Sequence, residues 1–205
     1  MHLRVSLLLL LTAVPLAAQA PPAEGWALHG HDLGGQRHAT LATIDTSNVA
    51  RLTTAWSWHS GVTATFQTTP IVVDTVMFVS LPFSGVAALD ARTGAEFWRY
   101  RHASRLQKLC CGPANRGVAV SAGLVYVGTV DGRLVALEAA TGAMRWDVTV
   151  AEYAGTTEAT SQLRQDDPMA NAGATGSTGV GIGAAPLVHD GKVFVGINGV
   201  GYGLH

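Results

Sequence analysis

The chain has 205 residues, of which only 13% are charged, and its formal net charge at pH 7 is -1. The near-neutral charge excludes a strongly basic protein of the kind that binds nucleic acid or anionic membranes. The high content of apolar residues excludes a disordered chain. The 24 glycines are typical of turn-rich β-structure.

The first twenty residues are expected to be a signal peptide rather than part of the fold. His2 and Arg4 supply a short basic start, and an apolar run follows from Val5 to Leu16. Ala18-Gln19-Ala20 then has the pattern of a cleavage site. We expect export to the periplasm, cleavage after this site, and a folded part at residues 21–205. The alternative is an uncleaved N-terminal anchor.

The segment from Trp26 to Trp58 predicts a lead-in loop. Asp45-Thr46-Ser47-Asn48 marks one short turn, and residues 52–56 are predicted to form a strand. Four histidines occur here without a cysteine or acidic residue at helpful spacing, so we interpret them as surface residues rather than metal ligands. They are His29, His31, His38 and His59.

One structural unit recurs along the chain. Residues 125–148 predict three antiparallel strands, with a hairpin at Asp131-Gly132 and a turn at Thr141-Gly142 that leads to Trp146. An Asp-Gly pair suits the positive φ angles of a tight hairpin. Residues 77–100 match this unit without a gap, 48 positions earlier, and share its Thr-Gly and Trp residues.

This repeat predicts the blades of a β-propeller. Residues 67–73 and the hairpin Asp74-Thr75 open the first copy, and a third copy begins at residues 190–196. Four short strands per unit, with a period of about 40 to 50 residues, are typical of propeller blades. Three blades cannot close a ring. We therefore expect the N-terminal part of a longer propeller, prone to associate through its open sheet edges.

Residues 154–183 depart from the repeat. They are rich in Gly, Ala, Thr and Ser and lengthen one blade connection by about 20 residues. A long connection inside a compact domain is usually functional or mobile, and both interpretations stay open.

The only two cysteines are adjacent, at Cys110 and Cys111, between the first and second repeats. They are either free thiols or a disulfide between neighbours. Adjacent Cα atoms lie closer than the usual disulfide range, so such a ring would be strained and rigid. Strain of this kind tends to lie where a ligand is held. Export of a chain without another cysteine favours the ring.

Over residues 26–205 the sequence resembles the exported alcohol dehydrogenases that depend on pyrroloquinoline quinone (PQQ), of the methanol and ethanol type. The most specific part is the run Cys-Cys-Gly-Pro-Ala-Asn-Arg-Gly at residues 110–117. The lead-in at residues 34–49 and the blade repeat also match, although non-catalytic propellers of the superfamily share the repeat. The resemblance implies an all-β propeller of eight four-stranded antiparallel blades, with PQQ in the central channel and Ca²⁺ beside it.

The resemblance also implies which residues contact the cofactor. Cys110 and Cys111 would form a vicinal disulfide against one face of the quinone. Arg116 would pair with a carboxylate or quinone oxygen of PQQ, and a surface ion pair is its alternative. Gln67 stands where the family often has a glutamate, and its amide can still donate and accept. Weaker cofactor contacts are expected from Asn198, Gly199 and Val200.

Two departures from the family affect the expected cofactor site. Gly201 stands where the family has its calcium-binding glutamate, and glycine has no side-chain oxygen for a hard cation. Binding of Ca²⁺ is therefore possible but left open, and no residue is assigned as a metal ligand. Gly183 likewise replaces a cofactor-bonding threonine.

The resemblance places no catalytic residue in this chain. The family's catalytic aspartate, its general base, belongs to a later blade. We interpret Asp131 as a turn residue, and Asp166 and Asp167 as part of the irregular insert. Trp98 and Trp146 match the family's tryptophan docking motif, which packs each blade on the next and donates the indole N–H to a neighbouring carbonyl.

The sequence therefore predicts part of an exported PQQ-dependent dehydrogenase. The complete protein would oxidise an alcohol or a similar hydroxyl substrate and pass electrons to a cytochrome c or a membrane quinone. The fragment itself is expected to be inactive. One alternative is a non-catalytic propeller scaffold or binding module, favoured by Gly183 and Gly201. Another is a sugar dehydrogenase of the same superfamily, suggested by residues 66–70.

Overall fold

A computed structural model of the chain describes residues 26–104, 112–151 and 180–198. The expected signal peptide and most of the predicted insert at residues 154–183 lie outside these residues. Within the described ranges the structure contains β-strands and two short 3-10 helices, η1 (Val49–Arg51) and η2 (Pro82–Ser84). None of the helices in these ranges is long and apolar enough to cross a membrane.

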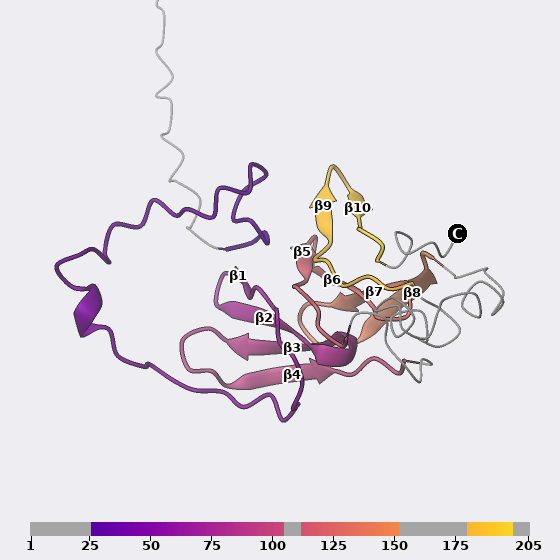
Figure 1. The fold of residues 1–205 in the computed structure, drawn as a ribbon, viewed down its shortest axis with the longest axis horizontal. Helices are drawn as coiled ribbons and strands as arrows, with labels where there is room; N and C mark the ends of the chain where they lie inside the picture. Colours follow the sequence, from indigo (N-terminus) through magenta and orange to yellow (C-terminus); the bar gives the residue numbers. More distant parts are fainter. Residues whose placement is uncertain (1–25, 105–111, 152–179, 199–205) are drawn as a thin grey trace, which may run out of the picture.

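The strands form three antiparallel sheets in chain order (Figure 1). The first sheet contains β1 (Ile71–Val73), β2 (Val76–Leu81), β3 (Gly85–Asp90) and β4 (Glu96–Tyr100). The second contains β5 (Ala119–Ser121), β6 (Leu124–Gly128), β7 (Arg133–Glu138) and β8 (Met144–Thr149). The third pairs β9 (Leu187–His189) with β10 (Lys192–Phe194). The predicted blades and their hairpins are confirmed.

The repeat extends to the details of strand pairing. Ala88 lies opposite Trp98 in the first sheet, and Ala136 lies opposite Trp146 in the second. Each pair is followed by a register shift at the same relative position, next to a leucine. The two blades therefore share one local geometry, as the period of 48 residues predicts.

The core lies between neighbouring blades. Successive residues of a strand point to opposite faces of the sheet. Val125 and Val127 pack against the first sheet, in a cluster that includes Ile71 and Phe78. Tyr126, between the two valines, packs in a different cluster together with Val188 and Val193 of the third sheet. Burial of each large apolar side chain stabilises this arrangement by about 1.5 to 3 kcal/mol.

Tryptophan side chains connect consecutive units at one end of the blades. The indole N–H of Trp98 donates to the carbonyl of Ala139 over 2.9 Å. Its ring lies so close to Gly142 that a Cβ there would be 2.5 Å from the ring. The predicted docking role is confirmed for Trp98. Trp146 packs beside Tyr126, with ring centroids 5.8 Å apart.

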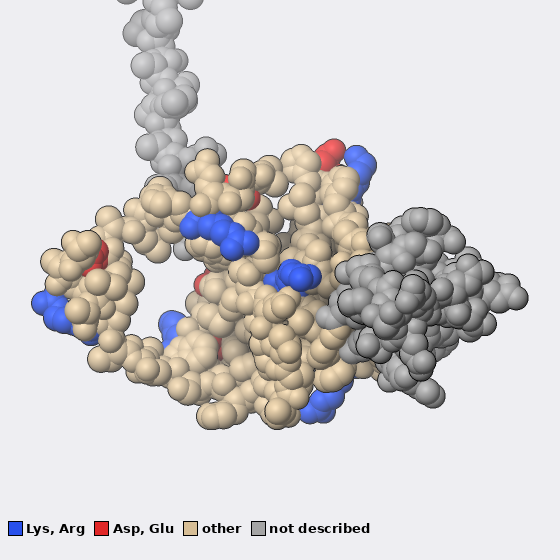
Figure 2. Space-filling model, in the orientation of Figure 1, with Lys and Arg blue, Asp and Glu red and all other residues tan. Residues whose placement is uncertain are grey.

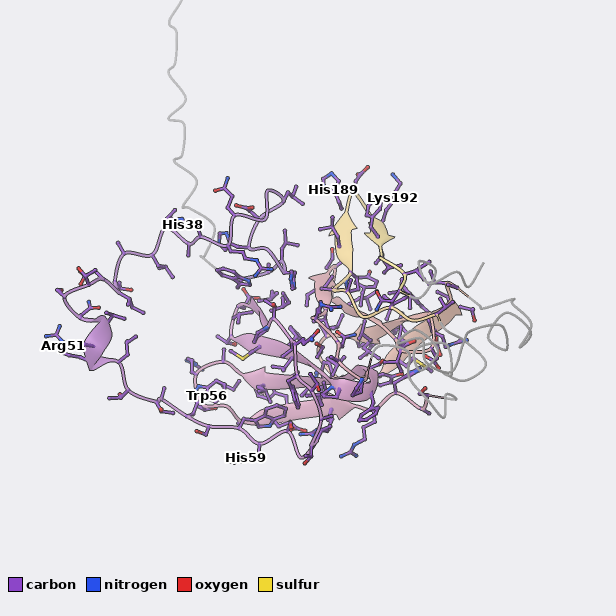
Figure 3. All side chains as sticks on the ribbon, viewed as in Figure 1. His38, Arg51, Trp56, His59, His189 and Lys192 are labelled. Atoms are coloured by element: carbon purple, nitrogen blue, oxygen red, sulfur yellow. The ribbon has the colours of Figure 1, made fainter. Side chains whose placement is uncertain are left out.

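The segment before the first blade departs from the prediction. The strand expected at residues 52–56 does not form, because this stretch has no partner strand within the described residues. Instead, Trp56 donates its indole N–H to the carbonyl of Ala91 over 3.2 Å and covers Gly94, beside the β3–β4 turn (Figure 3). Trp56 thus repeats the contact that Trp98 makes one blade later.

The lead-in loop packs on the first strands of the sheets. The carbonyl of Trp26 accepts a hydrogen bond from the N–H of Val72 over 2.8 Å. His29 and His31 are partly buried in this loop. His38 and His59 are exposed. Among the described residues no group of three His, Cys, Asp or Glu side chains is arranged to hold a metal ion.

Candidate cofactor-binding site

Three short segments meet at one end of the blades, where each leads into the first strand of its sheet. They precede β1, β5 and β9, and β5 lies beside both other strands (Figure 1). The N–H of Thr69 donates to the carbonyl of Arg116 over 3.0 Å. The N–H of Arg116 donates in turn to the carbonyl of Gly183 over 2.9 Å. We call residues 67–69, 115–117 and 182–183 the belt.

Two predicted cofactor residues converge on the belt at Gly183. A Cβ at this position would lie 2.8 Å from Nδ2 of Asn198 and 3.4 Å from Nη1 of Arg116. Asn198 is held there by paired backbone hydrogen bonds with Gly181, of 2.7 and 3.2 Å. The space that a side chain of residue 183 would occupy is therefore taken by the amide of Asn198 and the guanidinium of Arg116. This crowding gives a physical reason for glycine at position 183.

Arg116 presents its side chain outward while its backbone is fixed. The residue is exposed, and no carboxylate of the described residues pairs with its guanidinium. The neighbouring Asn115 is 2% exposed and holds the turn in place. Its Nδ2 donates to the carbonyl of Gly128 over 2.9 Å, and its Oδ1 accepts from the N–H of Gly117 over 2.9 Å. Arg116 thus offers a charged donor on a rigid turn.

Gln67 lies at the start of the belt and is exposed. The next residue, Thr68, is anchored to the first blade because its Oγ1 accepts from the N–H and the hydroxyl of Ser80, over 3.2 and 2.8 Å. No hydrogen bond of the structure connects Gln67 with Arg116 or Asn198. The structure therefore places Gln67 in the same belt without joining it to the other two predicted residues.

The remaining predicted cofactor residues lie outside the described residues. They are Cys110, Cys111, Gly199 and Val200, together with Gly201. Their predicted disulfide and cofactor contacts stay predictions. Two residues after Cys111, the carbonyl of Pro113 accepts a hydrogen bond from the N–H of Phe83 over 2.9 Å. Phe83 lies in η2, between β2 and β3.

A buried contact between the side chains of His102 and Asp131 joins the first two blades at the same end. Nε2 of His102 lies 2.8 Å from Oδ1 of Asp131, and the two side chains are only 5% and 8% exposed. The hydroxyl of Thr129 donates to the same carboxylate oxygen. Nδ1 of His102 lies 3.2 Å from the hydroxyl of Tyr100. A cleft of about 410 Å³ opens beside the pair.

This environment changes the acidity of Asp131. Burial acts to raise the pKa of the carboxyl group, but the hydrogen bonds from His102 and Thr129 outweigh it and lower the pKa to about 2. The sequence interpretation of Asp131 as a turn residue is therefore incomplete. The sequence alone does not point to His102. It lies between the repeats, and the residue 48 positions later is Val150, so the contact is not part of the repeated pattern.

The consecutive four-stranded blades and their tryptophan contacts define the chain as a β-propeller protein. Residues 26–198 match the family described as glucose/ethanol/alcohol dehydrogenase, beta-propeller domain. The chain therefore belongs to the PQQ β-propeller family, and the predicted resemblance is confirmed.

Relatives with assigned activities agree with this family. The 1-butanol dehydrogenase (cytochrome c) of Thauera butanivorans is 37% identical over 87% of this chain and 23% of its own length. The quinohemoprotein alcohol dehydrogenase ADH IIB of Pseudomonas putida is 37% identical over 98% of this chain and 28% of its own length. The chain thus spans about a quarter of the length of these relatives.

Solved structures give the same result for the fold. The quinohemoprotein alcohol dehydrogenase of Comamonas testosteroni superposes with a TM-score of 0.71 at 36% identity, over 89% of this chain and 24% of that chain. A europium-containing methanol dehydrogenase superposes with a TM-score of 0.69 at 30% identity, over 86% of this chain and 28% of that chain.

Proposed function

We propose that this chain forms the opening, PQQ-binding part of a periplasmic alcohol dehydrogenase with an eight-bladed propeller. The complete protein oxidises an alcohol and passes the electrons to a cytochrome c. Family membership and the printed activities of the relatives support the reaction class. The observation that carries the assignment to this chain is the convergence of Arg116 and Asn198 on Gly183.

The described donors fit an anionic, planar cofactor. PQQ supplies a quinone that accepts two electrons when it is bound. The guanidinium of Arg116 can donate two parallel hydrogen bonds to a carboxylate, and the amides of Asn198 and Gln67 can donate to carboxylate or quinone oxygens. Because the belt holds the backbone of Arg116 before the cofactor arrives, little backbone freedom is lost on binding.

The cysteine pair completes the proposed site. A disulfide between Cys110 and Cys111 would present a rigid surface without donor hydrogens to one face of the quinone, and Gly199 and Val200 would contribute backbone contacts. For Ca²⁺ the fit is poor. The described residues contain no group of three His, Cys, Asp or Glu side chains that could hold the ion, and Gly201 has no side-chain oxygen.

No aspartate of this chain is proposed as the catalytic base. Oδ1 of Asp131 is already hydrogen-bonded to His102 and Thr129, within the contact between the first two blades. The base that takes the alcohol proton is proposed to lie in the part of the complete protein that corresponds to the other three quarters of the relatives.

The direct test is reconstitution of the complete protein, recovered from the periplasm and freed of cofactor. Addition of PQQ should produce absorbance from bound quinone and alcohol-dependent reduction of a cytochrome c. A non-catalytic scaffold would give no alcohol-dependent reduction under the same conditions, and that result would refute the proposed activity. A membrane quinone in place of cytochrome c tests the other acceptor.

A further inference from the structure

The turn between β6 and β7, residues 129–132, and the last residue of β6, Gly128, are hydrogen-bonded to both sides of the belt. This stretch exchanges hydrogen bonds with segments far apart in the sequence. Nδ2 of Asn115 donates to the carbonyl of Gly128 over 2.9 Å. The N–H of Ile182 donates to the carbonyl of Thr129 over 2.8 Å. The N–H of Val130 donates to Oγ of Ser84 over 2.9 Å.

Two of these contacts are made by residues next to Arg116 and Gly183. Asn115 precedes Arg116, and Ile182 precedes Gly183, on which Arg116 and Asn198 converge. Both neighbours are buried, so they transmit the position of the turn to the belt. The relative placement of the donors therefore depends on the turn keeping one conformation.

His102 and Asp131 fix that conformation from the first blade. Their contact of 2.8 Å joins the end of β4 to the turn, and the hydroxyl of Thr129 donates to the same oxygen. Tyr100 orients the imidazole through Nδ1. A buried pair resists motion, since separating the partners leaves an uncompensated polar or charged group away from water. The charged groups nearby, Arg133 and Asp147, bind one another over 2.7 Å.

We propose that His102 and Asp131 are positioning residues for the cofactor: they lock the β6–β7 turn, and the turn holds Arg116 and Asn198 at Gly183. The ligand in this inference rests on the proposed function, whereas the mechanical link between the pair and the belt does not. Loss of the pair loosens the belt and weakens binding of PQQ without touching any group that contacts the cofactor.

The test compares His102→Ala and His102→Gln with Trp98→Phe. Gln retains an amide donor near the position of Nε2, so it should restore much of what Ala loses. Trp98→Phe removes a hydrogen bond between the same two blades, to Ala139, away from the belt. It controls for a general loss of contact between the blades.

Two readouts apply to the complete protein. In the cofactor-free protein, hydrogen exchange of the amides of Arg116 and Ile182 should be about tenfold faster or more in His102→Ala, and close to wild type in His102→Gln and Trp98→Phe. Titration with PQQ should show an affinity loss of about tenfold or more for His102→Ala only.

The possible outcomes separate the two proposals. If His102→Ala lowers the melting temperature as Trp98→Phe does, while exchange at Arg116 and Ile182 and the affinity for PQQ remain those of wild type, the pair is purely structural and the inference is wrong. If the wild-type protein binds no PQQ, the proposed function fails, and the exchange measurement still decides whether the pair positions the belt.

Discussion

Gly183 leaves room for two polar side chains because it has none of its own. The amide of Asn198 and the guanidinium of Arg116 occupy the space beside its Cα. A sequence comparison alone treats this glycine as the loss of a cofactor-bonding threonine. The structure gives another account, in which Asn198 supplies a polar group at the same place.

We predict that Gly183→Thr weakens the site instead of repairing it. Its Cβ would lie 2.8 Å from Nδ2 of Asn198, so the amide must move, and overpacking should lower the free energy of unfolding by about 1 to 3 kcal/mol. Denaturant unfolding and PQQ titration measure both effects. Gly196→Ala is the control, because a Cβ there meets only Ala184, at 3.9 Å. A Gly183→Thr protein with wild-type stability and tighter PQQ binding would contradict this account of Asn198.

The pair of His102 and Asp131 makes stability depend on pH in the acid range. The pKa of Asp131 is lowered from 3.8 to about 2 by folding. Its contribution to stability, about 1 to 2 kcal/mol, is therefore present above pH 4 and is lost as the pH falls through the folded pKa. Denaturant unfolding between pH 5 and 2 should show a smaller decline for Asp131→Asn than for wild type. Parallel declines would show that folding leaves the pKa of this carboxyl group unchanged.

At the scale of the strand and the turn, tryptophan contacts determine how one blade packs on the next. Trp56 donates to the carbonyl of Ala91, and Trp98 donates to the carbonyl of Ala139. These two alanines are 48 residues apart, which is the period of the repeat. Each ring also covers the glycine of a Thr-Gly turn. The contact is therefore a repeated element of the fold, formed even by Trp56, which belongs to no strand of the described residues.

Removal of the indole N–H should have a measurable and limited cost. Trp98→Phe should lower the free energy of unfolding by about 0.5 to 1.5 kcal/mol, since the ring is kept and one hydrogen bond is lost. Trp98→Ala should cost more, because the ring over Gly142 is lost as well. Denaturant unfolding measures both changes. The neighbouring Phe97 is 56% exposed, so Phe97→Ala should change stability by less than about 0.5 kcal/mol. Equal effects at positions 97 and 98 would argue against the docking role.

The sequence predicts these elements unequally well, for a physical reason. Alternating apolar residues, Asp131-Gly132 and Thr141-Gly142 act locally, so they predict the strands and hairpins correctly. Residues 52–56 have strand-like composition, but a strand also needs a partner, and none of the described residues provides one. The role of His102 can be seen only in the structure, because its contact with Asp131 joins two blades and does not recur in the repeated sequence pattern.

At the scale of the whole molecule, the blades stack side by side around their first strands, and the face seen in Figure 2 carries scattered charges of both signs without one dominant patch. The outer strands β4 and β8 carry exposed apolar side chains, among them Phe97, Met144 and Val148. Such edges are available for further strands or another copy of the chain.

We predict that residues 21–205 produced alone associate and do not turn over alcohol. Association follows from the unpaired sheet edges, and inactivity follows from the proposed location of the base elsewhere in the complete protein. Size-exclusion chromatography and an assay with PQQ, alcohol and cytochrome c check the two parts. A monomeric, active polypeptide of this length would overturn both.

The central claim is that Arg116, held on the belt, binds PQQ. The most direct measurement is a PQQ titration of the complete, cofactor-free protein in three forms: wild type, Arg116→Ala and Arg145→Ala. Arg145 pairs with Glu138 in the second blade and is the matched control. Loss of a charge-assisted hydrogen bond should weaken affinity about 10- to 100-fold for Arg116→Ala, and Arg145→Ala should bind as wild type does. Equal affinity in all three proteins would contradict the claim.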